Sequence, residues 1–204
     1  IYNELQNYML TKTRLGIPIL TAVEGIQGIL QNNSTLFPHA IAQGSTFNPG
    51  LIERMTEAAG AEAATMGIHQ VLSPVFDIAR ELRWGRVEET YGEDPYLIAE
   101  MGIGFVKGYQ KHRITCTPKH FVAHGTPTGG LNCAFVSGGE REFRSMHLYP
   151  FARVIKEADP LCIMSCYSAY DGIPVSASPY YMTDVLRDEL GFKGYVYSDW
   201  GSVD

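Results

Sequence analysis

Short apolar runs alternate with amphipathic stretches along the whole chain. Runs rich in Val, Ile and aromatic residues predict β-strands at residues 16–23, 71–76, 114–121, 161–167 and 194–198. Apolar residues at helical spacing predict helices at residues 49–67, 95–110, 140–158 and 182–190. Nearly continuous apolar strands alternating with amphipathic helices are typical of a parallel sheet covered by helices. The pattern therefore predicts the α/β class.

Two of the predicted helices carry clear end signals. Asp94 precedes Pro95, which is the arrangement of an N-cap followed by a proline in the first helical turn. Gly191 follows the last predicted helix, where a glycine commonly ends a helix in a left-handed conformation. We expect helices to begin and end at these two points.

The strand ends distinguish between the two parallel α/β architectures, the doubly wound sheet and the (β/α)8 barrel. Each predicted strand ends in, or is directly followed by, polar or ionisable residues, namely Glu24, Asp77, Lys119 with His120, Tyr167 and Asp199. A barrel collects such groups on one face, whereas a doubly wound sheet concentrates them at a switch point with a glycine-rich phosphate loop. The chain has no GxGxxG or Walker pattern. We therefore expect a TIM-type barrel.

The composition argues against several kinds of binding partner. The chain has 204 residues with 16 basic and 22 acidic side chains, a net charge of −6, and 45% hydrophobic residues. This balance argues against a nucleic-acid or anionic-membrane surface, and no apolar run is long enough to predict a membrane span. The four cysteines lack zinc-site spacing, so we expect structural thiols: Cys116, Cys133, Cys162 and Cys166.

The residues at the strand ends favour a sugar as substrate. The carboxylates Asp199 and Glu24 and the donors Lys119, His120 and Arg86 are expected on one face, where they can pair with many hydroxyl groups. Aromatic side chains that could stack on sugar rings stand beside them: Trp84, Tyr167 and Trp200. Helix capping or ion pairing is the structural alternative for each carboxylate, and Asp77 fits either an active-face group or an ion pair with an arginine. We expect no cofactor and no metal, because phosphate-binding loops and metal-ligand spacings are missing from the sequence.

Five ordered motifs carry a family resemblance. They are GIPILTAVEGIQG at 16–28, RWGRVEETYGEDP at 83–95, KHFVAHG at 119–125, MSCYSAYDGIP at 164–174 and GFKGYVYSDW at 191–200. With these motifs the chain resembles the N-terminal barrel domain of the family 3 glycoside hydrolases, which includes β-glucosidases, β-xylosidases and exo-glucanases.

The resemblance implies a role for each matching residue. Asp199 matches the catalytic nucleophile of a retaining glycosidase, which forms a glycosyl-enzyme that water then hydrolyses. Arg86, Lys119 and His120 match residues that hold the hydroxyl groups of the sugar in the −1 subsite. The other matching positions are Glu24, where many members carry an Asp that binds the sugar, Tyr167 near the nucleophile, and Trp200 in the wall of the next subsite. A β-linked glucoside or oligosaccharide is the implied substrate.

The sequence departs from the family pattern at a few points. Ser168 and Asp171 stand where Asn is frequent, and Gln27 stands where His is frequent. The second carboxyl group that a retaining glycosidase needs lies in a downstream domain in multidomain members. Members of the single-domain N-acetylglucosaminidase branch use an Asp and a His on one loop, but residues 124–133 contain His124 and no Asp. The resemblance therefore implies the multidomain branch, with its acid/base outside this chain.

The number of strands bears on domain organisation. We count five predicted strands, whereas a complete barrel has eight βα units and about 250 residues. We expect residues 1–204 to form a partial N-terminal catalytic barrel domain of a longer β-glucosidase-like enzyme, inactive by itself, with a periplasmic or extracellular location implied by the resemblance. The alternatives are a non-catalytic carbohydrate-binding barrel, or an activity of the β-xylosidase or N-acetylglucosaminidase type.

Overall fold

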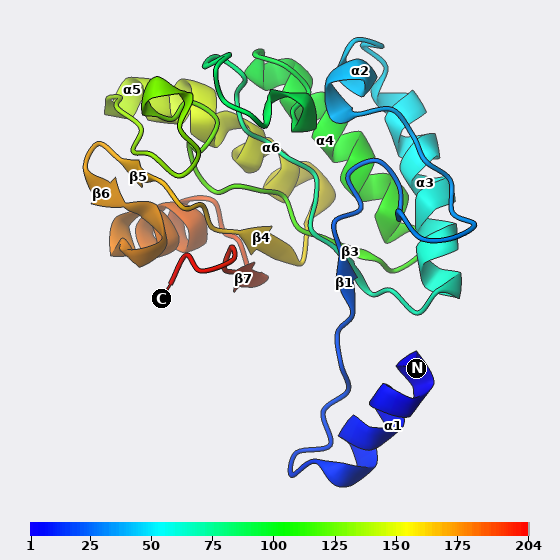
Figure 1. Cartoon of the computed structure of the whole chain (residues 1–204). Helices are drawn as coiled ribbons and strands as arrows, with labels where there is room; N and C mark the ends of the chain where they lie inside the picture. The colour runs from blue at the N-terminus through cyan, green and yellow to red at the C-terminus, as the bar shows by residue number, and fades with distance from the viewer. Residues whose placement is uncertain (204) are drawn as a thin grey trace.

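The computed structural model describes residues 1–203 and alternates strands with helices, as the sequence predicts (Figure 1). The strands are β1 (Ala22–Val23), β2 (Gln70–Val71), β3 (Thr115–Cys116), β4 (Cys162–Met164), β5 (Ala169–Tyr170), β6 (Ile173–Pro174) and β7 (Tyr195–Tyr197). The α-helices are α1 (Tyr2–Lys12), α2 (Ala40–Gly44), α3 (Pro49–Thr65), α4 (Pro95–Gln110), α5 (Glu140–Glu142) and α6 (Leu148–Ala158). Shorter or irregular helical segments are η1 (Val87–Glu89), η2 (Thr128–Gly130), η3 (Phe143–His147), η4 (Val175–Ala177) and η5 (Tyr180–Glu189).

Five of the strands run parallel in the order of the sequence. β1, β2 and β3 form one sheet, and β4 pairs with β7 in another. A parallel bridge between Phe121 and Ser165 joins the two sheets, and a second bridge between Val75 and Lys119 extends the pairing after β2 and β3. Each strand thus lies beside the next one in the chain. All carboxyl ends meet on one side, which confirms the predicted α/β class with parallel strands.

Helices α3, α4 and α6 cover the outer side of these strands (Figure 1). Asn48 and Asp94 cap α3 and α4 by accepting the backbone N–H of Leu51 and Leu97, and each helix starts with a proline. The predicted cap at Asp94 is therefore confirmed. A Cβ atom at Gly108 would overlap Thr56 of α3, so this glycine allows the two helices to pack closely.

The predicted elements exist, but several boundaries differ. The strands are two or three residues long, and isolated parallel bridges continue the pairing beyond β2, β3 and β4. The helix predicted at 140–158 is divided by the π-helical segment η3, and the helix predicted at 182–190 is the π-helical η5. Gly191 has φ of 68°, as expected for a glycine after a helix end. The short helix α2 and the hairpin β5–β6 are additional to the prediction.

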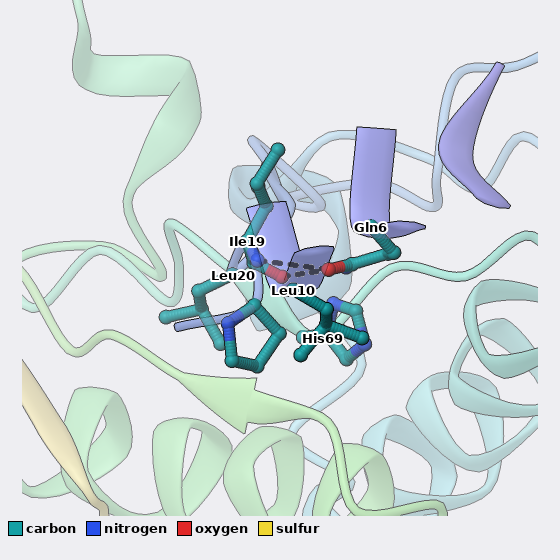
Figure 2. Close-up of a pocket in the computed structure, with 6 residues that line it drawn as sticks. Gln6, Leu10, Ile19, Leu20 and His69 are labelled. Carbon is teal, nitrogen blue, oxygen red and sulfur yellow. Dashed lines mark hydrogen bonds between the residues drawn. The ribbon is translucent and has the colours of Figure 1, made fainter. Parts of the chain in front are cut away.

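The N-terminal segment differs most from the prediction. Of the strand expected at 16–23, only β1 joins the sheet, and the residues before it run outward to α1 (Figure 1). Figure 2 shows how α1 is held: the Gln6 side-chain amide donates to the carbonyl and accepts from the N–H of Ile19, both at 2.8 Å. This pairing borders a shallow cavity of about 400 Å³, which Leu10, Leu20 and His69 also line. No residue of α1 is buried.

Candidate active site

A cavity of about 460 Å³ lies at the carboxyl ends of the parallel strands. Its walls come from the segments that follow β1, β2, β3, β4 and β7, so residues far apart in the sequence meet there. The lining residues are Glu24, Ile26, Gln27, Leu30, His39, Arg86, Glu88, Glu89, Lys119, Asn132, Tyr167, Asp199 and Trp200. This set contains six of the seven site residues predicted from the sequence.

Asp199 follows β7 and presents its carboxylate to the cavity. The residue is 7% exposed. Its Oδ1 accepts hydrogen bonds from the Tyr167 hydroxyl at 2.9 Å and from the Trp200 backbone N–H at 2.8 Å. Its Oδ2 is buried and has no hydrogen-bond partner among residues 1–203. One oxygen is thus held by two hydrogen bonds, while the other has no hydrogen-bond partner among the described residues.

The hydroxyl group of Tyr167 remains protonated. Burial and the adjacent Asp199 carboxylate raise the pKa of the phenol to about 12. At neutral pH the phenol therefore donates to Asp199. Trp200 is 77% exposed and borders the cavity beside Asp199, as expected for a side chain that forms an open wall.

Lys119 and Glu24 form an ion pair in the wall of the cavity. Lys119 Nζ lies 2.8 Å from Glu24 Oε2, and the lysine side chain is 4% exposed while that of Glu24 is 50% exposed. A buried ammonium requires hydrogen-bond acceptors. One of its donors is used by Glu24, and the others can bind the hydroxyl groups of a ligand in the cavity.

Arg86 is fixed by several contacts. Its Nε and Nη2 donate to the two carboxylate oxygens of Glu89 at 2.7 and 2.8 Å, and the guanidinium lies 5.8 Å from the centre of the Trp84 ring. Burial opposes the charge of each partner, but their mutual bonds outweigh it, so the pKa of Arg86 is raised and that of Glu89 is lowered. This bidentate geometry gives Arg86 a defined direction toward the cavity.

His120 lies behind the cavity wall and connects two carboxylates. Its Nδ1 lies 2.6 Å from Asp77 Oδ2, and both side chains are 1% exposed. Its Nε2 lies 3.2 Å from Arg86 Nη2 and 3.5 Å from Asp199 Oδ2. Burial, together with the charges of Arg86 and Lys119, lowers the pKa of His120 well below its usual value. His120 is therefore a neutral imidazole at neutral pH.

A second buried histidine packs beside the first. The His124 ring lies 4.8 Å from that of His120 and 5.4 Å from that of Trp84, measured between ring centres. Its Nδ1 lies 2.9 Å from Ser168 Oγ, and burial lowers its pKa to about 4. His124 is thus a neutral, buried imidazole at neutral pH that packs against His120 and Trp84.

The structure brings together all seven predicted site residues, with His120 behind the wall that the other six form. The alternative of an arginine partner for Asp77 is wrong, because Asp77 bonds to His120. Nearby, Arg83 pairs with Glu81, and Glu89 pairs with Arg86.

Other residues of the site were not predicted from the sequence. Gln27, Leu30, His39 and Asn132 line the cavity, and Asn132 also accepts from the Trp84 indole N–H at 3.0 Å. Gln27 belongs to the motif at 16–28 but stands there only as a departure from the family pattern, whereas Leu30, His39 and Asn132 lie on loops outside the five motifs, so no local signal identified them. Within residues 1–203 no group of three potential ligands could hold a metal ion.

Comparison with known proteins identifies the family. Residues 2–204 match the glycosyl hydrolase family 3 N terminal domain. The chain belongs to glycosyl hydrolase family 3. It is 37% identical over 93% of its length to a β-xylosidase from Formosa agariphila and 36% identical over 92% to a β-glucosidase from Rhizobium radiobacter. The family resemblance seen in the sequence is thus confirmed.

Solved family 3 structures share the fold. A β-glucosidase from Erythrobacter marinus superimposes with a TM-score of 0.94 at 35% identity over 99% of the chain. A mutant β-glucosidase from Listeria innocua in complex with laminaribiose gives 0.91 at 34% identity over 97% of the chain. The chain spans about a quarter of these proteins, 28% of each of the two structures and 28% and 24% of the two curated relatives. No helix within residues 1–203 has the length and apolar character needed to cross a membrane.

Proposed function

We propose that the protein contributes the sugar-binding face and the nucleophile of a retaining, exo-acting β-glycosidase of the β-glucosidase type. The observation that carries this proposal is the Asp199 carboxylate, which lines a cavity with cationic donors and has one oxygen fixed by two hydrogen bonds and one without a hydrogen-bond partner among residues 1–203. In the mechanism, Oδ2 attacks the anomeric carbon of the terminal sugar and the aglycone leaves. Water then opens the glycosyl-enzyme and regenerates the carboxylate.

The donors around the cavity suit the terminal sugar in this mechanism. Lys119 carries a buried positive charge and Arg86 a half-buried one, and Glu24 supplies an acceptor paired with Lys119. A hydroxyl group both donates and accepts, so a sugar can bind across this ion pair. Hydrogen bonds to charged groups contribute about 1.5–3 kcal/mol each, so three of them account for most of the affinity of a monosaccharide.

We further propose that the acid/base lies outside these 204 residues. Of the carboxylates lining the cavity besides Asp199, Glu24 is paired with Lys119 and Glu89 with Arg86. An ion pair with a cation favours the ionised form of a carboxyl group, which has no proton to donate to a leaving group. Glu88 is exposed at the rim and is the remaining internal candidate. The relatives are about four times longer and could supply the group from another domain.

The fold suits the same proposal. Five parallel strands lie in chain order with their polar residues at one end. A (β/α)8 barrel is built from this succession, and its active site lies at the carboxyl ends of its strands. We propose that residues 1–204 form about five βα units of such a barrel.

Covalent trapping tests the nucleophile independently of the acid/base. A 2,4-dinitrophenyl 2-deoxy-2-fluoro-β-glucoside carries a leaving group that needs no protonation. Mass spectrometry of the digested chain should find the fluorosugar on Asp199, and Asp199→Ala should abolish labelling. Asp171→Asn is a matched control at an exposed turn and should label as the wild type does. Failure to label Asp199 in the wild-type chain would contradict the proposal.

Turnover of unactivated substrates tests the location of the acid/base. We expect the 204-residue chain to hydrolyse methyl β-glucoside about 10²- to 10⁴-fold more slowly than a protein that includes the downstream domain. Comparable activity of the chain alone, lost in Glu88→Gln, would place the acid/base within the chain. Parallel assays with aryl β-glucoside, β-xyloside and N-acetylglucosaminide distinguish the sugar. Inertness toward all three by the longer protein would favour a carbohydrate-binding barrel.

A further inference from the structure

Asp77 is a buried carboxylate with no position in the proposed chemistry. It lies after β2, its side chain is 1% exposed, and its Oδ2 makes the short contact of 2.6 Å to His120 Nδ1. Its Oδ1 is buried without a hydrogen-bond partner in the described part of the chain. Burying a carboxylate is costly unless its interactions offset that cost. A role for its one contact, to His120, would explain why the carboxylate is buried here.

The contacts around His120 determine which ring nitrogen carries the proton. Burial raises the pKa of Asp77 to about 6, so at higher pH the carboxylate is ionised and can only accept. Nδ1 must then be the protonated nitrogen, and Nε2 has a free lone pair. The guanidinium of Arg86 can only donate, and its Nη2 lies 3.2 Å from Nε2. Both neighbours therefore favour the same tautomer.

This tautomer affects the free oxygen of Asp199. His120 Nε2 lies 3.5 Å from Asp199 Oδ2, close enough for a small movement to form a hydrogen bond if Nε2 carried a proton. Such a bond would withdraw electron density from Oδ2. With Nε2 unprotonated, Oδ2 has no donor on this side. Oδ1 is already occupied by Tyr167 and Trp200, so the two oxygens stay distinct.

We propose that Asp77 is a positioning residue that holds His120 in the Nδ1–H tautomer and thereby keeps Asp199 Oδ2 free of a hydrogen-bond donor. It acts through His120 and touches no substrate. The inference rests on the proposed function in one respect, because it takes Asp199 as the nucleophile. The tautomer itself is a property of the folded chain and can be measured without any reaction.

Nitrogen-15 NMR of the imidazole rings tests the first part. In the wild-type chain at about pH 7.5, above the pKa of Asp77, His120 should show a protonated Nδ1 and an unprotonated Nε2. Its signals are assigned by their loss in His120→Gln. In Asp77→Asn the side-chain amide can donate as well as accept, so the Nε2–H form should become populated. A wild-type ring that carries a proton on Nε2 overturns the proposal, whether or not the variant folds.

Labelling kinetics with the activated fluoroglucoside test the second part. We expect Asp77→Asn to slow covalent labelling of Asp199 on the order of 10²-fold or more, as the wrong histidine tautomer does in other hydrolases. Asp94→Asn makes the same chemical change at a helix cap and should leave both readouts as in the wild type. A shifted tautomer with unchanged labelling rate overturns the role of Asp77 toward Asp199. If the wild type does not label at all, the proposed function fails, while the NMR result still decides the tautomer.

Discussion

Mild acid should destabilise this chain, because the folded chain buries two neutral histidines that do not contact Asp199. His124 and His147 are both buried, and burial lowers the pKa of each to about 4 from an ordinary value of 6.5. Below pH 6.5 the unfolded chain binds protons that the folded chain does not. The free energy of unfolding therefore falls as the pH drops toward 4, and these two groups cause no further loss below that pH.

The magnitude is set by the same pKa values. Each histidine removes about 1.4 kcal/mol per pH unit in this window. Asp77 acts in the opposite direction, because its pKa is raised to about 6 in the folded chain. As the pH falls below 6, the folded chain takes up this proton before the unfolded chain does, and the resulting gain in stability offsets the loss from one histidine. His120, whose pKa is also lowered, adds to the loss. The net loss between about pH 6 and 4.5 is therefore at least about 2 kcal/mol, a large share of a typical domain stability.

Urea unfolding at about pH 7, 6 and 4.5 measures this effect. In His147→Met the free energy of unfolding should fall less steeply with decreasing pH, by about 1.4 kcal/mol per unit. The adjacent buried Leu148 offers a matched control, since Leu148→Ala should lower stability equally at every pH. An unchanged slope in His147→Met would refute the assignment of a neutral buried imidazole at this position.

Two other substitutions test the site and its support. Arg86→Lys keeps the charge but loses the paired hydrogen bonds to Glu89. Labelling of Asp199 by the activated fluoroglucoside should therefore slow by about 10-fold or more. Arg83→Lys, at an exposed position, is the control and should not change the labelling rate. Gly102→Ala places a Cβ atom inside the buried ring of Phe76 and should lower the free energy of unfolding, measured with urea, by about 3 kcal/mol. A double variant that also carries Phe76→Leu should recover part of this loss. Equal stability of the single and double variants would contradict that contact.

Local sequence patterns were enough to predict the parallel strands and the polar residues at their carboxyl ends. Glu24 and Lys119 are 95 residues apart in the chain, yet each was placed at a strand end from its own surroundings. Their meeting is a consequence of the parallel arrangement alone, since parallel strands collect their carboxyl ends on one side. The side chains of the site could therefore be predicted as a set from the sequence.

The partners within the site could not be predicted in this way. Asp77 and His120 follow the neighbouring strands β2 and β3, and whether Asp77 meets an arginine or an imidazole depends on the direction of both side chains. The hairpin β5–β6 was missed for a different reason. Asp171 and Gly172 have φ of 48° and 79°, a turn that an Asp-Gly pair signals, but the two strands beside it are only two residues long and too short to show an alternating pattern.

The buried polar groups behind the cavity connect stability to the proposed chemistry. The burial that lowers the pKa of His120 and makes the fold sensitive to acid also keeps its Nε2 unprotonated beside Asp199. A substitution that opens the packing of His124 against Trp84 would let water reach both imidazoles, raise their pKa values and make the free energy of unfolding fall less steeply with decreasing pH. The same change would favour an imidazolium next to Asp199 Oδ2 and weaken the nucleophile. Among variants of the packing around His120 and His124, the loss of stability on acidification and the reactivity of Asp199 are therefore expected to decrease together.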